Sequence, residues 1–467
     1  MGLKFSRHRH VSAPNRCQNS TCKLEFFGLT TMQLAHIFSS SIKPLQAFLT
    51  RGRNRHNMDR DGVVLPSGPV VPKRPQKTFA KASNSDVLVI SCPDPTAEDR
   101  ERDFHQMRGQ RLARQEQWND VARAIKAADR ALRKTAGGMP IADLIGYGAR
   151  ADVVSACEHA LLSGKPAKDA TLLAGIEALE TVLAEHPDDY AIAMIVAQAH
   201  MDIGWAWRGG RWDVEISATN GKAFSAHFDR AADILAPYKN VHPKPASLAA
   251  AECAQRAGRQ DGSDKIADAY EALIMLDPSN TRTMRAMGNH LLPRWFGDYN
   301  TLELEARRTA ARTQKIWGAG AYTWVQFDAI AFDDIACARL DVAFFVDGLR
   351  DILARTTDQY TVNLLAAYCA NTIGNSAGGN DEADQVRCQI ADCAQWIIRE
   401  HLTELHPMLW AHAARGFDNN LRVRCPDRFA ASGEADALRI IGTLFRRDIA
   451  AGKRVVFTED GPITQPA

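Results

Sequence analysis

Residues 172–203 read LLAGIEALETVLAEHPDDYAIAMIVAQAHMDI, and this stretch decides the fold class. Apolar residues recur on both sides of Pro187 with the 3.6-residue spacing of one helix face. Before the proline they are Leu172, Ile176, Leu179 and Leu183, and after it they are Ile192, Ile195, Val196, Ala199 and Ile203. The pattern predicts two amphipathic helices joined by a short turn.

Proline interrupts the helical pattern at three similar turns. They are Glu185-His186-Pro187, Val241-His242-Pro243 and Leu276-Asp277-Pro278. Proline disrupts a helix interior but fits a turn or the first helical position. Pro243 and Pro278 are 35 residues apart, and Pro187 and Pro243 are 56 apart, which is one such period plus about 22 residues. The spacing predicts repeated helix pairs, with Asp188-Asp189 capping the helix after the first turn.

This organisation resembles the tetratricopeptide repeat, a unit of two antiparallel helices with a proline near its end. The best-matching segment is Leu112 to Leu132, in which Trp118 stands at the turn between two helices near Gln117. The likeness covers roughly residues 105–290 and continues as a looser helical pattern to 450. It implies an all-α solenoid of about ten to fourteen stacked helices with a concave groove, because each pair must bury its apolar face against the next.

A second resemblance lies at residues 292–299, Leu-Pro-Arg-Trp-Phe-Gly-Asp-Tyr. This string is similar to a Pro-Arg-Trp-Gly-Gly-Ser string in a bacterial family of helical domains of unassigned function. Residues 317–322 and 362–366 add to the likeness, which spans about 285–375, while Phe296 and Asp298 depart from it. The resemblance implies a helical fold and no activity.

Composition divides the chain into four segments. Residues 1–99 are expected to be a disordered tail, because the segment is rich in Arg, His, Ser and Pro; residues 1–95 hold 14 Lys and Arg against 5 Asp and Glu. Residues 100–373 are expected to form the tetratricopeptide-like array. A Gly- and Asn-rich loop at 374–381 then separates it from C-terminal helices over 382–450. Residues 451–467 are expected to be a disordered tail, although Val455-Val456-Phe457 has the character of a short strand.

Three interpretations of the N-terminal tail compete. Met1-Gly2 with Ser6 fits the N-myristoylation pattern. The apolar stretch Leu24 to Phe38 could serve as a targeting signal, although no clear cleavage site follows it. The third interpretation is that translation starts later, at Met32 or Met58, so that residues 1–57 do not belong to the mature protein. A zinc cluster of His8, His10, Cys17 and Cys22 is disfavoured, because structural zinc sites use tighter spacings within a folded knuckle.

Charge and cysteine content disfavour several classes of protein. The net charge is +2 and residues 1–95 carry +9, so the remainder carries about −7 and offers no basic surface for nucleic acid. No run of about 18 apolar residues occurs, so a membrane span is not expected. The ten cysteines are scattered, which favours a reducing, cytoplasmic location over a disulfide framework. No cofactor is expected, because neither a phosphate-binding loop nor a zinc-hydrolase motif is present.

The corner formed by Arg294, Trp295 and Asp298 is the first candidate binding site. A guanidinium offers a planar fork of donors to a carboxylate or phosphate. The competing interpretation is structural: Trp295 wedges between helices, while Arg294 pairs with Asp298 or with helix-end carbonyls.

The second candidate is an aromatic and basic segment in the insertion that lengthens one repeat. Its members are Trp205, Trp207, Arg208, Arg211 and Trp212. Trp and Arg are enriched at interaction hot spots. The competing interpretation is that these tryptophans fold back to cover apolar surface.

Two further motifs are interpreted as chance matches. Residues 374–378 fit Gly-x-Ser-x-Gly, but this nucleophile motif requires a preceding strand, and residues 360–372 have a helical pattern. Cys388 and Cys393 would point about 140° apart on a helix, which disfavours a shared metal ion. Cys393 is instead expected to pack as a small core residue.

The leading functional prediction is a non-catalytic scaffold that binds a protein partner, as a peptide or helix, in the solenoid groove. The alternative is an enzyme or small-molecule binder with a pocket at the Arg294–Asp298 corner. The two differ in shape, because a scaffold needs an open groove and an enzyme a closed pocket with convergent polar groups.

Overall fold

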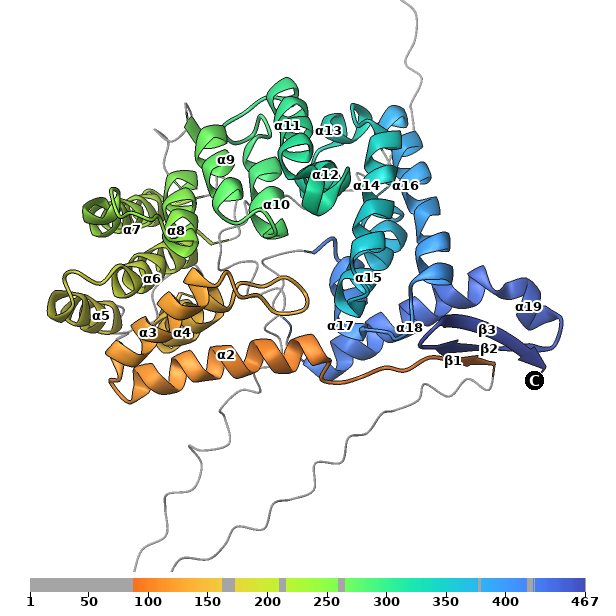
Figure 1. Ribbon diagram of the computed structural model, residues 1–467, viewed down its shortest axis with the longest axis horizontal. Coiled ribbons are helices and arrows are strands. Elements are labelled where there is room, and N and C mark those ends of the chain that lie inside the picture. Colours follow the sequence, from red (N-terminus) through yellow and green to blue (C-terminus); the bar gives the residue numbers. More distant parts are fainter. Residues whose placement is uncertain are drawn as a thin grey trace, which may run out of the picture.

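The computed structural model describes residues 87–161, 173–209, 216–258, 265–376, 379–417, 423 and 425–466. These residues form a largely helical protein whose helices pack in pairs and follow one another around an arc (Figure 1). They include 16 helices of seven or more residues, which exceeds the ten to fourteen expected. None of the helices in these ranges is long and apolar enough to cross a membrane. Residues 1–86 of the tail predicted over 1–99, with its targeting and zinc motifs, lie outside the described residues. The prediction of disorder is wrong for the rest, because residues 88–89 form a strand and a helix begins at Ala97.

The first half of the arc contains seven α-helices. They are α2 (Ala97–Arg114), α3 (Trp118–Arg130), α4 (Ile141–Ala160), α5 (Ala174–Glu185), α6 (Tyr190–Arg208), α7 (Ala218–Leu235) and α8 (Ala246–Ala257), with the 3₁₀ turn η2 (Ala236–Tyr238) before α8. Three proline turns lie between helices, as the sequence predicts: α5 ends before Pro187, Pro243 lies between η2 and α8, and α9 (Ile266–Leu276) ends before Pro278. Asp189 caps α6 by accepting a hydrogen bond from the Ala191 N–H at 2.9 Å, which confirms the predicted cap.

The second half continues from α9 to the C-terminal helices. It contains α10 (Thr281–His290), α11 (Tyr299–Trp317), α12 (Gly320–Phe332), α13 (Asp334–Ala338), α14 (Val342–Arg355), α15 (Gln359–Ala367), the π-helix η4 (Tyr368–Ile373), α16 (Asp381–Glu400), α17 (Pro407–Ala413), α18 (Pro426–Leu444) and α19 (Arg446–Ala450). Cys393 on α16 is buried and Cys388 is exposed, which confirms the core role predicted for Cys393.

The buried apolar residues form two clusters that meet at α8. One face of this helix, with Leu248 and Ala251, belongs to the cluster of residues 112–254. The other face, with Ala249 and Cys253, belongs to the cluster that runs to Phe457. A helix with apolar residues on two faces joins the halves of the arc into one body.

A three-stranded sheet joins the beginning and the end of the described chain. Strand β1 (Leu88–Val89) pairs in parallel with β2 (Lys453–Thr458), which pairs antiparallel with β3 (Gly461–Pro466). The prediction of a disordered tail over 451–467 is therefore wrong for 453–466. Val455 and Phe457 turn to the core in the alternating pattern of a strand. The prediction failed because β1, which pairs with β2, lies more than 360 residues earlier in the sequence.

The loop over 131–140 extends into the inside of the arc (Figure 1) and bonds to α2. The Thr135 hydroxyl donates to Glu98 Oε1 at 2.7 Å, and the Gly137 N–H donates to Glu98 Oε2 at 2.7 Å. A Cβ atom added to Gly137 would lie 2.7 Å from Cδ1 of Tyr360 on α15, so only glycine allows this approach. The loop thus bridges the first and the last third of the chain.

Candidate functional site

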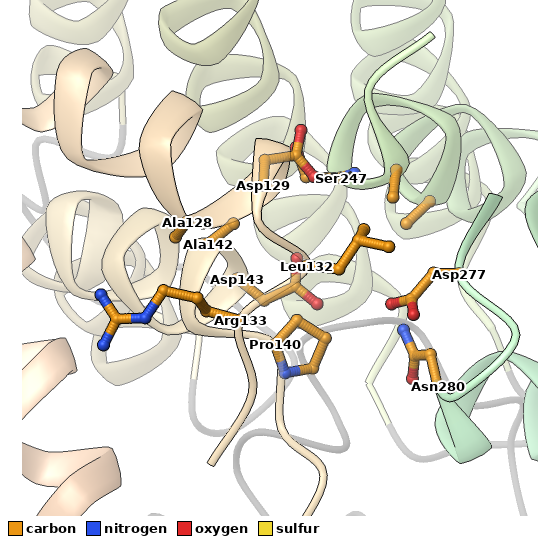
Figure 2. Close-up of a pocket in the computed structure, with 12 residues that line it drawn as sticks. Ala128, Asp129, Leu132, Arg133, Pro140, Ala142, Asp143, Ser247, Asp277 and Asn280 are labelled. Atoms are coloured by element: carbon orange, nitrogen blue, oxygen red, sulfur yellow. Dashed lines mark hydrogen bonds between the residues drawn. The ribbon is translucent and has the colours of Figure 1, made fainter.

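An acidic pocket lies on the inside of the arc, between α3, α4, α8 and the turn before α10 (Figure 2). Asp129 comes from α3, Asp143 from α4 and Asp277 from the turn that the sequence analysis identified by its proline. Arg133 also borders the pocket, but its guanidinium turns away from the three carboxylates (Figure 2). The cavity volume is about 20 Å³, which accommodates a water molecule and no organic substrate.

The carboxylates of this pocket are largely satisfied from within the protein. Asp129 accepts from the Ser247 N–H at 3.0 Å and from its hydroxyl at 2.9 Å, and Asp277 pairs with Lys134 at 2.6 Å. Burial raises the pKa of Asp129 and of Asp143 above their ordinary value, and Arg282 opposes this effect at Asp143. These contacts connect α3 with α8, and the loop between α3 and α4 with the turn before α10.

A second cavity shares Asp143 with the first. It is about 10 Å³ in volume and is also lined by Arg150, Gln198 and Arg282. Arg150 Nε donates to Asp202 at 2.6 Å. The Arg150 Nη1 and Gln198 Oε1 atoms have no hydrogen-bond partner among the described residues. A single buried water would satisfy both atoms, so this cavity is a structural feature of the α4–α6 contact.

A larger cavity, with a volume of about 420 Å³, is a cleft between α11, α12 and α13, of which α11 and α13 lie on the outer side of the arc (Figure 1). We call it the outer cleft. Its lining comes from α11, α12, α13 and the turn before α14: Tyr299, Asn300, Leu302, Glu303, Leu304, Arg307, Gln326, Ala336, Arg339, Leu340 and Asp341. The volume falls within the range of ligand-sized pockets.

Glu303 organises one wall of the outer cleft. Its Oε2 atom accepts from the Tyr322 hydroxyl at 2.9 Å and from Gln326 Nε2 at 3.0 Å, while Oε1 accepts from Arg307 Nε at 2.6 Å. Burial and the adjacent Glu303 carboxylate raise the pKa of Tyr322, so its hydroxyl stays a donor. Both Glu303 oxygens are therefore satisfied.

The two arginines of the outer cleft have different partners. Arg307 pairs with Glu303 and also with Asp341, whose carboxylate lies 2.8 Å from Nη2. Arg339 donates to the side-chain oxygen of Asn300 at 2.7 Å and lies over the Tyr299 ring, 5.5 Å from its centroid. Arg339 has no carboxylate within 4.0 Å among the described residues.

The predicted Arg294–Asp298 corner borders this cleft, but the structure does not bring its two charges together. Arg294 donates to Asn289 Oδ1 at 2.8 Å, whereas the prediction paired it with Asp298 or helix-end carbonyls. Asp298 is exposed and caps α11, accepting from the N–H groups of Asn300 and Thr301. These bonds, with one from the Thr301 hydroxyl, lower the pKa of Asp298.

Trp295 of the same corner is half-buried. Its ring contacts His290 in an edge-to-face arrangement, with centroids 5.8 Å apart. Burial lowers the pKa of His290 to about 4, so this ring is neutral at pH 7. The Trp295 Nε1 atom is buried without a hydrogen-bond partner in the described chain. Trp295 therefore packs as a wedge after α10 rather than facing the outer cleft.

The second predicted cluster is split by the structure. Trp205 and Arg208 are buried at the end of α6, where Trp205 packs against Phe224 with ring centroids 5.0 Å apart. The Arg208 guanidinium lies 5.4 Å from the Trp205 ring centroid, and Trp207 is half-buried. Arg211 and Trp212 lie outside the described residues. Trp205 and Arg208 contact Phe224 of α7 and cover its apolar surface.

The Gly-x-Ser-x-Gly match lacks the strand that a nucleophile motif requires. Ser376 of the Gly-x-Ser-x-Gly match follows the π-helix η4 instead of a strand, and its hydroxyl donates to the Thr372 carbonyl. Among the residues that the structure describes, no group of three or more His, Cys, Asp or Glu side chains is positioned to hold a metal ion.

Comparison with family models, curated proteins and solved structures gives no significant match, so both resemblances rest on the quoted residues alone. Sequence reasoning did not single out Gln326 or Arg339. Gln326 and Arg339 have no motif around them, and only the packing of three helices brings them together.

Proposed function

We propose that the chain is a non-catalytic, tetratricopeptide-like scaffold in the cytoplasm that binds a protein partner at the outer cleft. The observation that supports this most directly is a cleft of about 420 Å³ bordered by unusually exposed apolar side chains. Leu304 is 48% exposed, and Ile335, next to the lining residue Ala336, is 49% exposed. Exposed apolar side chains beside a cleft are typical of interaction sites.

The sizes of the cavities favour binding over catalysis. Asp129 and Asp143, whose carboxyl pKa values are raised, line a space of about 20 Å³, which admits no substrate. Arg294 and Asp298, the residues of the alternative enzyme hypothesis, bond to different neighbours. An enzyme would need convergent, unsatisfied polar groups in a space of substrate size.

The proposed partner site is the outer cleft rather than the concave groove that the repeat resemblance implies. The loop over 131–140 bonds to Glu98 and contacts Tyr360, so it fills part of the inner side of the arc. The described lining of the outer cleft comes from α11, α12, α13 and the turn before α14, and it includes no loop that fills the cleft.

A photo-crosslinking amino acid placed at position 304 tests the proposal in cells of the native host. We expect one dominant protein adduct, identified by mass spectrometry, which is lost when Arg339→Gln is added. The matched control carries the crosslinker at position 173, where Leu173 is 55% exposed and lies on the other half of the arc. Equal adduct patterns at the two positions would remove the support for a partner site at the cleft.

A further inference from the structure

Arg339 presents a positive charge at the outer cleft and forms no ion pair within 4.0 Å among the described residues, although its charge also lowers the pKa of the exposed Asp298. The carboxylates near it are already engaged, since Asp341 binds Arg307 and the Phe344 N–H, and Asp298 caps α11. Arg339 itself makes one bond, to the neutral amide of Asn300, and its guanidinium is held over Tyr299. A guanidinium held in this way is preorganised to bind a carboxylate through two parallel hydrogen bonds.

Gln326 offers an unused acceptor in the same cleft. The residue is 3% exposed, and its Nε2 atom must face Glu303, which can only accept hydrogen bonds. Its Oε1 atom is consequently left without a donor among the described residues. Buried polar atoms are nearly always paired in proteins, and this one has almost no exposed surface, so a buried water is the donor that fits it.

Apolar side chains complete the lining. Leu302 and Leu340 are buried in it, while Leu304 is half-exposed. The accessible site therefore combines one cationic fork and an aliphatic surface. An extended peptide offers the complement of both, because its side chains differ in polarity.

We infer that the outer cleft binds a peptide segment of a partner protein that carries an acidic residue beside an aliphatic one. The carboxylate binds Arg339, and the aliphatic side chain packs on Leu304. This inference rests on the proposed function and specifies the chemistry of its partner.

Fluorescence anisotropy with the full chain and short synthetic peptides tests the inference. The probes are libraries of acetylated and amidated peptides with a fixed Leu-Glu, Leu-Gln or Leu-Lys core. We expect the Leu-Glu library to bind at least about tenfold more tightly than the Leu-Gln library, because an arginine–carboxylate pair is charge-assisted. Arg339→Gln should abolish that preference and Arg339→Lys should keep part of it.

Two variants separate binding from folding. Arg447→Gln removes the same charge from an exposed arginine on α19, outside the cleft lining, and should leave the preference unchanged. Leu304→Ser should weaken the binding of all libraries several-fold. Its melting temperature is measured in parallel, so that loss of fold is distinguished from loss of the aliphatic surface.

Each outcome decides for or against the inference. A Leu-Glu preference that depends on Arg339 supports it. Equal binding of the libraries, a preference for Leu-Lys, or binding of none of them overturns it. If the crosslink at position 304 still identifies a protein in those cases, the proposed function stands and only the acidic specificity fails. If the adduct patterns at positions 304 and 173 are also equal, the proposed function is lost as well.

Discussion

Glu98 on α2 and Thr135 in the α3–α4 loop form a buried hydrogen bond of 2.7 Å across 37 residues of sequence. The other oxygen of Glu98 accepts from Gly137, whose backbone lies against Tyr360. The Glu98 carboxylate thus holds the loop over 131–140, which lies between α2 and α15. Burial raises the pKa of Glu98 above its ordinary value, with Arg102, Thr135 and Gly137 opposing this effect.

Glu98→Gln should change how stability depends on pH. The folded-state pKa of Glu98 is raised, so its protonation contributes stability that is fully present below about 4.5 and is lost as pH rises through the folded pKa. The wild-type chain should therefore gain stability relative to Glu98→Gln as pH falls from 7 towards 4.5. Urea unfolding at several pH values measures the difference, and a constant difference would contradict the prediction.

The His200–His227 pair should make the α6–α7 contact sensitive to acid. Their Nδ1 atoms lie 3.0 Å apart, and Glu180 faces His200 Nε2 at 2.9 Å while pairing with Arg230. Burial and His200 lower the pKa of His227 to about 4 from 6.5, so its neutral form contributes stability above pH 6.5 that is lost as pH falls towards 4. The loss should reach about 2–3 kcal/mol.

His227→Leu provides the measurement for this pair. The variant should show a flatter loss of stability between pH 6.5 and 4 than the wild-type chain, because the titrating ring is gone. Chemical denaturation followed by circular dichroism reports the free energy of unfolding at each pH. If the variant loses as much stability as the wild-type chain between pH 6.5 and 4, groups other than His227 cause the acid sensitivity.

Asn363→Leu should be among the most destabilising single substitutions in the C-terminal half. The Asn363 side chain is fully buried; its oxygen accepts from the His406 N–H and from Trp410 Nε1, each at 3.0 Å, and its nitrogen donates to the carbonyls of Gln359 and Glu404. Leucine would leave these groups unpaired, at a cost of about 3 kcal/mol or more. Equilibrium unfolding tests this, with exposed Asn300→Leu as a control for the Asn-to-Leu change.

Substitutions in the buried ion pair of Arg285 and Asp328 should have strongly non-additive effects on the free energy of unfolding. Arg285 Nε and Nη2 each lie 2.8 Å from one Asp328 oxygen, and the guanidinium is 4.6 Å from the Phe327 ring centroid. Asp328→Ala alone should cost about 3–5 kcal/mol, because it leaves an uncompensated buried charge. Arg285→Met with Asp328→Ala should cost less than the sum of the single changes. Additive losses in this double-mutant cycle would refute the coupling.

The outer cleft shows where prediction from the sequence stopped. The Pro-Arg-Trp string directed attention to the corner that ends at Asp298, and the next two residues, Tyr299 and Asn300, line the cleft. Gln326 and Arg339 were not identified, because they lie on separate helices and in no motif. Trp205 and Arg208 were identified by type, yet their burial against α7 depends on a neighbour that periodicity does not specify.

The sequence by itself determined the helices, their proline turns and the Asp189 cap, because spacing, proline sterics and side-chain capping act within a few residues. It also identified Cys393 as a core residue from its place in a helical period. Only the tertiary structure decided the pairing of β1 with β2, the position of the loop held by Glu98, and the placement of Arg339 and Gln326 in the lining of one cleft. These features join residues far apart in the chain, and such contacts depend on how whole helices pack, which local patterns do not encode.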